Sequence, residues 1–148
     1  MENAYLTPLL LSAILGAAMG IERSLSGKHA GMRTYALVSL GSCLFVALGT
    51  MAAYELREFG GVNPVQVAGN IVVAIGFLGA GLTVFRGEHP VELTTAAGLW
   101  VAAAVGMACG FFLYTLAIVA MVLSILIFSF LAKIERHLSA RYGTKHEG

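Results

Sequence analysis

The residues in this sequence that are best suited to chemistry are carboxylates, arginines and threonines at the ends of apolar segments. They form two clusters, each beside a short polar stretch: Glu22, Arg23, Arg33 and Thr34, and then Arg86, Glu88, Glu92, Thr94 and Thr95. Carboxylate and hydroxyl oxygens could hold a hydrated Mg²⁺, which keeps most of its waters and needs only one or two carboxylates. Glu22 and Glu92 are therefore weak candidate metal ligands. Because the arginines equal the carboxylates in number, salt bridges that fix the two loops are the favoured interpretation.

Thr94 and Thr95 also have a purely structural explanation. A threonine at the start of a helix can accept a hydrogen bond from a first-turn N–H group and so cap the helix. The neighbouring carboxylate of Glu92 would suit the positive end of the helix dipole. Capping and a role in a site are therefore both open.

A second kind of polar residue lies inside an apolar segment. Gln66 and Asn70 are four residues apart, so they share one face of a helix. An amide without a hydrogen-bond partner in hydrocarbon is costly, so both side chains should face protein or water. They either form hydrogen bonds between helices or line a pore or pocket.

The sequence contains no arrangement typical of an enzyme. It lacks CxxC, HExxH, a glycine-rich phosphate loop and the spacing of a Ser/His/Asp triad. Cys43 and Cys109 lie in apolar segments and are predicted to be small buried hydrophobes rather than a disulfide. We therefore expect no catalytic residues, no cofactor and no nucleic-acid partner.

The elements that must position these residues are membrane-spanning helices. Hydrophobic residues make up 58% of the 148 residues, charged residues only 11%, and the mean hydropathy is +0.84. A soluble domain usually carries about 25% charged residues, and a helix needs about 20 residues to cross the bilayer core. We predict an all-α protein in the lipid bilayer with five transmembrane helices, at about 4–21, 34–54, 65–85, 93–109 and 111–132, followed by a short basic tail at 133–148.

The basic residues predict the orientation of these helices. Eight of the nine lysines and arginines fall in the first loop, the third loop and the tail: Arg23, Lys28, Arg33, Arg86, Lys133, Arg136, Arg141 and Lys145. Only Arg57 lies on the other side. Because cytoplasmic loops carry the excess of Lys and Arg, we expect the N-terminus outside and the C-terminus in the cytoplasm.

Glycines mark the surfaces on which these helices are expected to pack. Membrane helices associate by close backbone approach at small residues, because lipid tails are as apolar as leucine. The glycines concerned are Gly16 and Gly20 in the first helix, Gly76, Gly79 and Gly81 in the third, and Gly98 in the fourth. The third-helix group is the densest and predicts a packing centre there. Trp100 is expected to pack against a glycine surface.

Two helix ends resemble each other. Residues 15–23 align without gaps with residues 78–86, and after each copy a short loop leads to a helix that begins with threonine. The alignment predicts two parallel helical hairpins plus a fifth helix, whose glycine-rich ends approach each other; chance similarity between small-residue helices is the alternative. An exposed small-residue surface also predicts a homodimer or higher homo-oligomer, with its interface on the glycine face of the first or third helix.

Four motifs follow one another in the order and spacing of a known family. They are Gly20-Ile21-Glu22-Arg23, Ala30-Gly31-Met32-Arg33-Thr34, Gly76-Phe77-Leu78-Gly79-Ala80-Gly81 and Leu93-Thr94-Thr95-Ala96-Ala97-Gly98-Leu99-Trp100. Together they make the region from about 9 to 132 resemble the membrane domain of the MgtC/SapB family. The resemblance implies a bacterial inner-membrane protein of five helices, linked to growth when magnesium is scarce and, in pathogens, to virulence.

The resemblance also implies a mode of action. Some family members are thought to bind and restrain the membrane sector of the F-type ATP synthase, so a membrane subunit of that enzyme is an expected partner. Two features differ from the family: many members continue into a cytoplasmic α/β domain, and Glu92 stands where a small residue is usual. We expect a non-enzymatic magnesium-homeostasis protein that acts through membrane helix contacts with itself or a partner. The alternative is a channel or transporter for a cation such as Mg²⁺.

Overall fold

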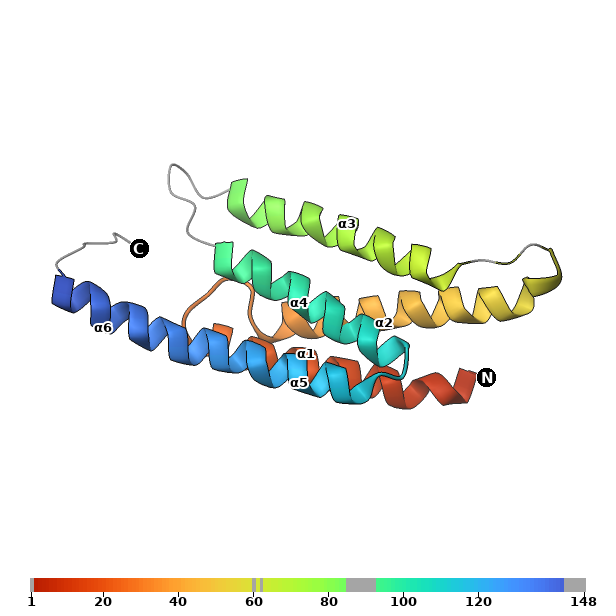
Figure 1. The fold of residues 1–148 in the computed structure, drawn as a ribbon, viewed down its shortest axis with the longest axis horizontal. Helices are drawn as coiled ribbons and strands as arrows, with labels where there is room; N and C mark the ends of the chain where they lie inside the picture. The colour runs from red at the N-terminus through yellow and green to blue at the C-terminus, as the bar shows by residue number, and fades with distance from the viewer. Residues whose placement is uncertain (1, 60, 62, 85–92, 143–148) are drawn as a thin grey trace.

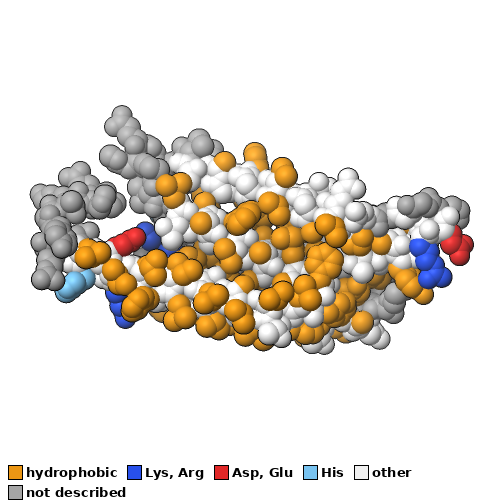
Figure 2. All heavy atoms as spheres, viewed as in Figure 1, with side chains coloured by type: hydrophobic (Ala, Val, Ile, Leu, Met, Phe, Trp, Pro, Cys, Tyr) orange, Lys and Arg blue, Asp and Glu red, His pale blue; other side chains and the backbone are white. Residues whose placement is uncertain are grey.

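The computed structural model describes residues 2–59, 61, 63–84 and 93–142, which are almost entirely helical and contain no strand (Figure 1). Five helices are long and apolar enough to cross a membrane: Asn3–Leu25, Met32–Glu55, Pro64–Thr83, Leu93–Gly110 and Tyr114–Glu135. Figure 2 shows charged side chains at the two ends of the elongated bundle and a mostly apolar surface between them. These observations confirm the all-α fold with five transmembrane helices.

In chain order the helices are η1 (Glu2–Tyr5), α1 (Leu6–Leu25), α2 (Met32–Glu55), η2 (Arg57–Phe59), α3 (Pro64–Val84), α4 (Leu93–Gly110), α5 (Tyr114–Leu126), η3 (Ile127–Leu131) and α6 (Ala132–Tyr142). The short helices η1 and η2 are 3₁₀ helices, and η3 is π-helical. The fifth span joins α5, η3 and the start of α6 in one run. The N-terminus and α6 lie at opposite ends of the bundle (Figure 1).

The fourth helix is the centre of the bundle, because α4 packs against α1, α2, α3 and α5. Small residues recur at every fourth position along one face of it: Gly98, Ala102, Gly106 and Gly110. A Cβ on Gly106 would collide with the carbonyl of Ser39, and one on Gly110 would lie 2.9 Å from the carbonyl oxygen of Cys43. The absence of side chains on this face therefore lets the backbones of α2 and α4 meet.

A second close approach joins α1 to α2. A Cβ on Gly16 would lie 2.6 Å from the carbonyl oxygen of Tyr35, and one on Gly20 would lie 2.5 Å from the Cα of Met32. Both glycines of the first helix are buried. The glycine face of α1 is thus used inside the chain, which leaves it unable to serve as an interface between copies.

The third helix lies at the edge of the bundle rather than at its packing centre (Figure 1). It packs against α2 and α4 through Ile71 and Ile75. A Cβ on Gly76 or Gly81 would meet no atom within 4 Å, and one on Gly79 would make an ordinary 3.4 Å contact with Ala96. The prediction of a packing centre here is wrong for the single chain, since the glycines of α4 are the ones that face α2.

The predicted approach of the two glycine-rich helix ends is also wrong for the described residues. α1 packs against α2, α4 and α5, whereas α3 packs against α2 and α4. The pair α2 and α4 therefore lies between the two helices whose ends align in sequence. The resemblance between residues 15–23 and 78–86 does not correspond to a shared contact surface.

The turn after α4 explains why the fifth helix starts at Tyr114 rather than near 111. The N–H of Leu113 donates to the carbonyl of Ala108 (2.8 Å), a hydrogen bond that ends a helix through a left-handed residue. That residue is Phe112, with φ of 61°. Its ring lies 5.1 Å from that of Tyr5 and 6.2 Å from that of Tyr114. An aromatic cluster of this kind suits the boundary between membrane and water.

Candidate functional site at the α1–α2 loop end

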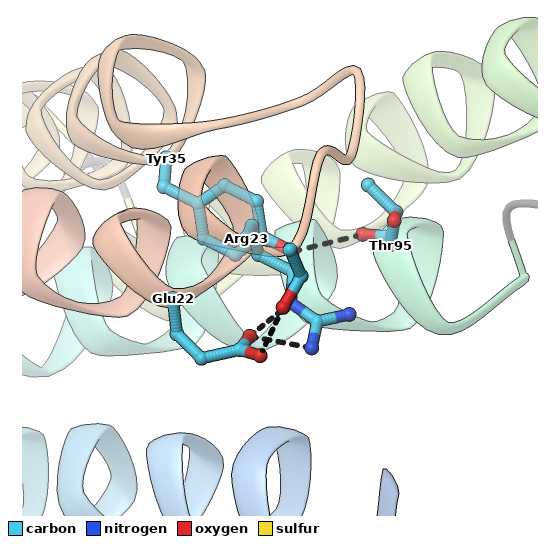
Figure 3. Close-up of polar contacts among 5 residues, drawn as sticks. Glu22, Arg23, Tyr35 and Thr95 are labelled. Carbon is cyan, nitrogen blue, oxygen red and sulfur yellow. Dashed lines mark hydrogen bonds and ion pairs between the residues drawn. The ribbon is translucent and has the colours of Figure 1, made fainter. Parts of the chain in front are cut away.

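Arg23, in the last turn of α1, turns its charge into the bundle. The residue is only 4% exposed, and its guanidinium carbon lies 4.0 Å from the centre of the Phe128 ring, which belongs to the π-helical segment η3. A buried charge is stable only when it is paired. The carboxylate of Glu22 provides that pair at 2.5 Å (Figure 3). Arg23 therefore links the end of α1 to the fifth span.

Tyr35 of α2 extends this contact to the fourth helix. Its ring meets Phe128 edge to face, with centroids 6.5 Å apart and an interplanar angle of 86°. Its hydroxyl donates to the carbonyl oxygen of Thr95 at 3.2 Å (Figure 3). A side chain at Gly98 would collide with this hydroxyl, so glycine leaves the room that Tyr35 needs.

These residues join four of the five spans at one end of the bundle. We call them the Arg23 cluster: Glu22, Arg23, Tyr35, Thr95, Gly98 and Phe128. A π-helical turn inside a longer helix is often found at functional sites. Here it lies where Phe128 covers the guanidinium, so the fifth span is joined to the cluster at its irregular turn.

The carboxylate of Glu22 is fully engaged. One oxygen pairs with Arg23, and the other accepts a hydrogen bond from the Ser26 hydroxyl at 2.8 Å. This geometry shows a salt bridge within the last turn of α1, not one that spans the loop to Arg33, and it leaves Glu22 poorly placed to bind a metal. Within the described part of the chain, no group of three or more His, Cys, Asp or Glu could hold a metal ion.

Arg33 and Thr34 do not join the Arg23 cluster. They lie in the first turn of α2, their side chains are exposed, and they line a polar hollow in the loop that follows α1. Of the first predicted cluster, the structure therefore brings together Glu22 and Arg23 and separates Arg33 and Thr34 from them.

The second predicted cluster is described only in part. Arg86, Glu88 and Glu92 lie outside the described residues. α4 begins at Leu93, so Thr94 and Thr95 lie inside its first turn rather than at its cap position, and the capping interpretation is wrong for both. The two threonines differ, because Thr94 is exposed whereas Thr95 is 1% exposed.

The amides of α3 face away from the bundle. The side chains of Gln66 and Asn70 are both exposed, and neither forms a hydrogen bond with another described residue. The single chain therefore covers neither amide. Trp100 is also 53% exposed, and it lines an apolar hollow of about 240 Å³ together with Val72 and Met107. The prediction that Trp100 packs on a glycine surface is therefore wrong.

Three residues at the α1–α2 loop end of the bundle were not identified as site residues from the sequence: Ser26, Tyr35 and Phe128. Ser26 lies four residues after Glu22, a spacing at which helical side chains meet. Tyr35 directly follows the Arg33-Thr34 pair. Phe128 carries no such signal, because it is one aromatic residue in a long uniform apolar run.

Comparison with known proteins places this sequence in a family. The sequence pattern of the MgtC family matches residues 9–137. YhiD of Escherichia coli (strain K12), named "Putative magnesium transporter YhiD", is 37% identical over 129 residues, which cover 86% of this chain and 60% of YhiD. SrpB of Synechococcus elongatus is 35% identical over 137 residues, covering 86% and 75%. MgtC of Salmonella typhimurium is 38% identical over 106 residues, covering 72% and 43%.

The family match extends over all five membrane-spanning helices. The chain spans about 60% of the length of YhiD and less than half of that of MgtC. No solved structure gives a significant match. Together with five membrane-spanning helices, the relatives indicate a bacterial membrane protein. With a family match that covers nearly the entire helical bundle, the chain belongs to the MgtC family.

Proposed function

We propose that this chain is a non-enzymatic, magnesium-linked protein of the bacterial inner membrane that acts through helix contacts on the exposed face of α3. Membership of the MgtC family and the magnesium in the name of YhiD support the link to magnesium. The exposed surface of α3 supports the proposal that the chain acts through helix contacts. The partner that fits this face best is α3 of a second copy; a membrane subunit of the F-type ATP synthase, which the resemblance implies, is the competing occupant.

One surface carries this proposal, and we call it the α3 face. Its residues recur three or four positions apart: Gln66, Gly69, Asn70, Val73, Gly76, Phe77 and Ala80. All of them are exposed, and Phe77 reaches 81%. Residues with this spacing lie on one side of a helix. The buried residues Ile71 and Ile75 lie on the opposite side, so α3 has a packed face and a free face.

The amides are the observation that argues most strongly for a partner. Asn70 lies six residues from the start of α3, about 9 Å along a helix axis, inside a hydrocarbon core about 30 Å thick. Unpaired amides there are costly, because lipid offers them no hydrogen bonds. An amide carries both donors and acceptors, so two identical amides can pair. A two-fold axis along the membrane normal would place Asn70 of each copy at the same depth.

The glycines of the same face would allow the two helices to approach closely. A Cβ on Gly69 or Gly76 would meet no atom of the chain within 4 Å. Small residues seven positions apart let helix backbones pack against each other in lipid. The α3 face therefore combines close approach with hydrogen bonding, which are the two forces that associate membrane helices.

The proposal can be tested by blocking the α3 face in cells. The variant Gly69→Leu/Gly76→Leu should fold, because neither position has a neighbour in the chain. In a bacterium that lacks its own family member, wild type is expected to support growth at low Mg²⁺ and this variant to fail. The control is Val119→Phe, a similar enlargement at an exposed position of α5. Full growth with the blocked α3 face would contradict the proposal.

A transporter is the second candidate, because the name of YhiD proposes magnesium transport. Purified protein in vesicles separates the two. Our proposal expects no Mg²⁺ flux above that of empty vesicles. A robust flux that Asn70→Ala abolishes would favour a channel lined by the α3 amides and overturn the helix-contact function.

A further inference from the structure

A polar hollow of about 340 Å³ lies in the loop between α1 and α2. Lys28, His29 and Arg33 line it, together with polar groups that include Thr34. None of its lining residues is acidic. The hollow therefore holds two fixed positive charges and an imidazole in a chain whose formal net charge is only +1.

The positive charge of this hollow is not cancelled by the nearest acidic residue in the sequence. Glu22 gives one carboxylate oxygen to Arg23 and the other to Ser26. In the described part of the chain, neither Lys28 nor Arg33 forms an ion pair. No carboxylate of the described residues therefore neutralises either cation.

The first turn of α2 also lines the hollow. The residue that caps α2 is Gly31, which has no side chain with which to cap the helix. The N–H of Met32 donates to the Ser24 hydroxyl at 3.0 Å. The N–H groups of the next two residues, Arg33 and Thr34, are first-turn donors that have no acceptor within the helix. Both residues line the hollow.

The position of the hollow indicates what kind of anion it would meet. It lies between the end of the first span at Leu25 and the start of the second at Met32. Leu25 is 84% exposed and Met32 is exposed as well. Cationic groups in the loop between two spans, with an exposed apolar side chain at the adjoining end of each span, match a molecule that has an anionic head and an apolar tail.

We propose that this hollow binds the phosphate of an anionic phospholipid headgroup, with Lys28 and Arg33 as its main contacts and Leu25 against an acyl chain. Basic hollows at the ends of membrane helices are suited to such headgroups. A free phosphate would gain the contacts with the cations but none with the apolar rim, and it would have to compete with lipids that are always present at this depth. The site is separate from the α3 face, so either proposal can fail without the other.

The test measures phosphatidylglycerol binding to the purified full chain in phosphatidylcholine nanodiscs. The variant Lys28→Gln/Arg33→Gln removes both cations of the hollow. The matched control Arg57→Gln/Lys133→Gln removes the same charge at two exposed positions elsewhere. A cation that contacts the lipid phosphate directly contributes roughly five-fold to its binding, so we expect the hollow variant, which loses two such contacts, to bind about thirty-fold more weakly. Arg57 and Lys133 do not line the hollow and cannot contact the same phosphate, so the control should bind within about twofold of wild type.

Two further measurements test whether the variants remain folded and whether the ligand is a lipid. Lys28→Arg/Arg33→Lys keeps both charges and should retain the affinity, which distinguishes charge from misfolding. Millimolar inorganic phosphate should not displace the lipid; complete displacement would assign the hollow to free phosphate and overturn the lipid proposal. Equal binding of phosphatidylglycerol and phosphatidylcholine by wild type would also overturn it, as would an equal loss of affinity in the control.

Discussion

Removing the charge of Arg23 should uncouple the fifth span from the first helix. The guanidinium lies 4.0 Å from the centre of the Phe128 ring and is 4% exposed. A desolvated cation over an aromatic ring contributes about 2 kcal/mol, against about 0.5–1 kcal/mol at an exposed site. We therefore expect Arg23→Met and Phe128→Leu to show a coupling energy of about 2 kcal/mol in a double-mutant cycle.

The chain offers an internal control for this cycle. Arg57 lies 4.8 Å from the ring of Tyr54, and both side chains are exposed. The same pair of changes there, Arg57→Met and Tyr54→Leu, should give no more than about 0.5–1 kcal/mol. The Arg23–Glu22 ion pair and the Phe128–Tyr35 ring contact are each lost in one single variant and again in the double variant, so they cancel in the cycle.

The assay is reversible unfolding in mixed micelles, followed by the fluorescence of Trp100, the single tryptophan. The unfolding free energies of wild type, both single variants and the double variant give the coupling energy directly. The role assigned to the Arg23–Phe128 contact would be refuted if its coupling energy were no larger than that of the Arg57–Tyr54 pair. It would also be refuted if the effects of Arg23→Met and Phe128→Leu were additive within about 0.5 kcal/mol.

Three further predictions follow from the same structure. Gly106→Ala should lower the unfolding free energy by about 1–3 kcal/mol, because the new methyl group would meet backbone that can move only if α2 and α4 separate. The control Gly41→Ala should be neutral or stabilising, because its Cβ would meet no atom within 4 Å. Equal effects of the two substitutions in the micelle assay would contradict this prediction. Tyr35→Phe should cost about 1 kcal/mol in that assay through the lost hydroxyl contact, and an unchanged stability would count against it. For topology, a cysteine at Ser26 should be protected from an impermeant maleimide in intact cells and one at Glu58 should be labelled; the reverse pattern would invert the orientation expected from the basic residues.

The spans could be predicted from the sequence because they depend on a one-dimensional property. Five apolar runs of nearly twenty residues each require five helices in a bilayer, whatever their mutual packing. The start of the fifth helix was harder to predict from the sequence. Its boundary depends on a left-handed conformation at Phe112, a residue type that rarely adopts it.

The packing could not be predicted in the same way. The glycines of α3 and α4 are equivalent as residue types, yet a Cβ on Gly106 would collide with the backbone of α2 whereas one on Gly76 would meet no atom within 4 Å. Which glycine packs depends on the direction that each helix face takes in three dimensions. The contact between Arg23 and Phe128, more than one hundred positions apart in the sequence, depends in the same way on tertiary packing and on the π-helical turn.

The measurement that tests the central claim most directly is disulfide crosslinking along α3 in native membranes. Single cysteines at each position from 69 to 80, in a chain with Cys43 and Cys109 replaced by alanine, report which side of the helix meets a second copy. Our account predicts crosslinking maxima at Gly69, Val73 and Gly76, on the α3 face, and minima at the two buried isoleucines. No dimer at any position, or maxima on the packed side of α3, would contradict the claim that the chain acts through this face.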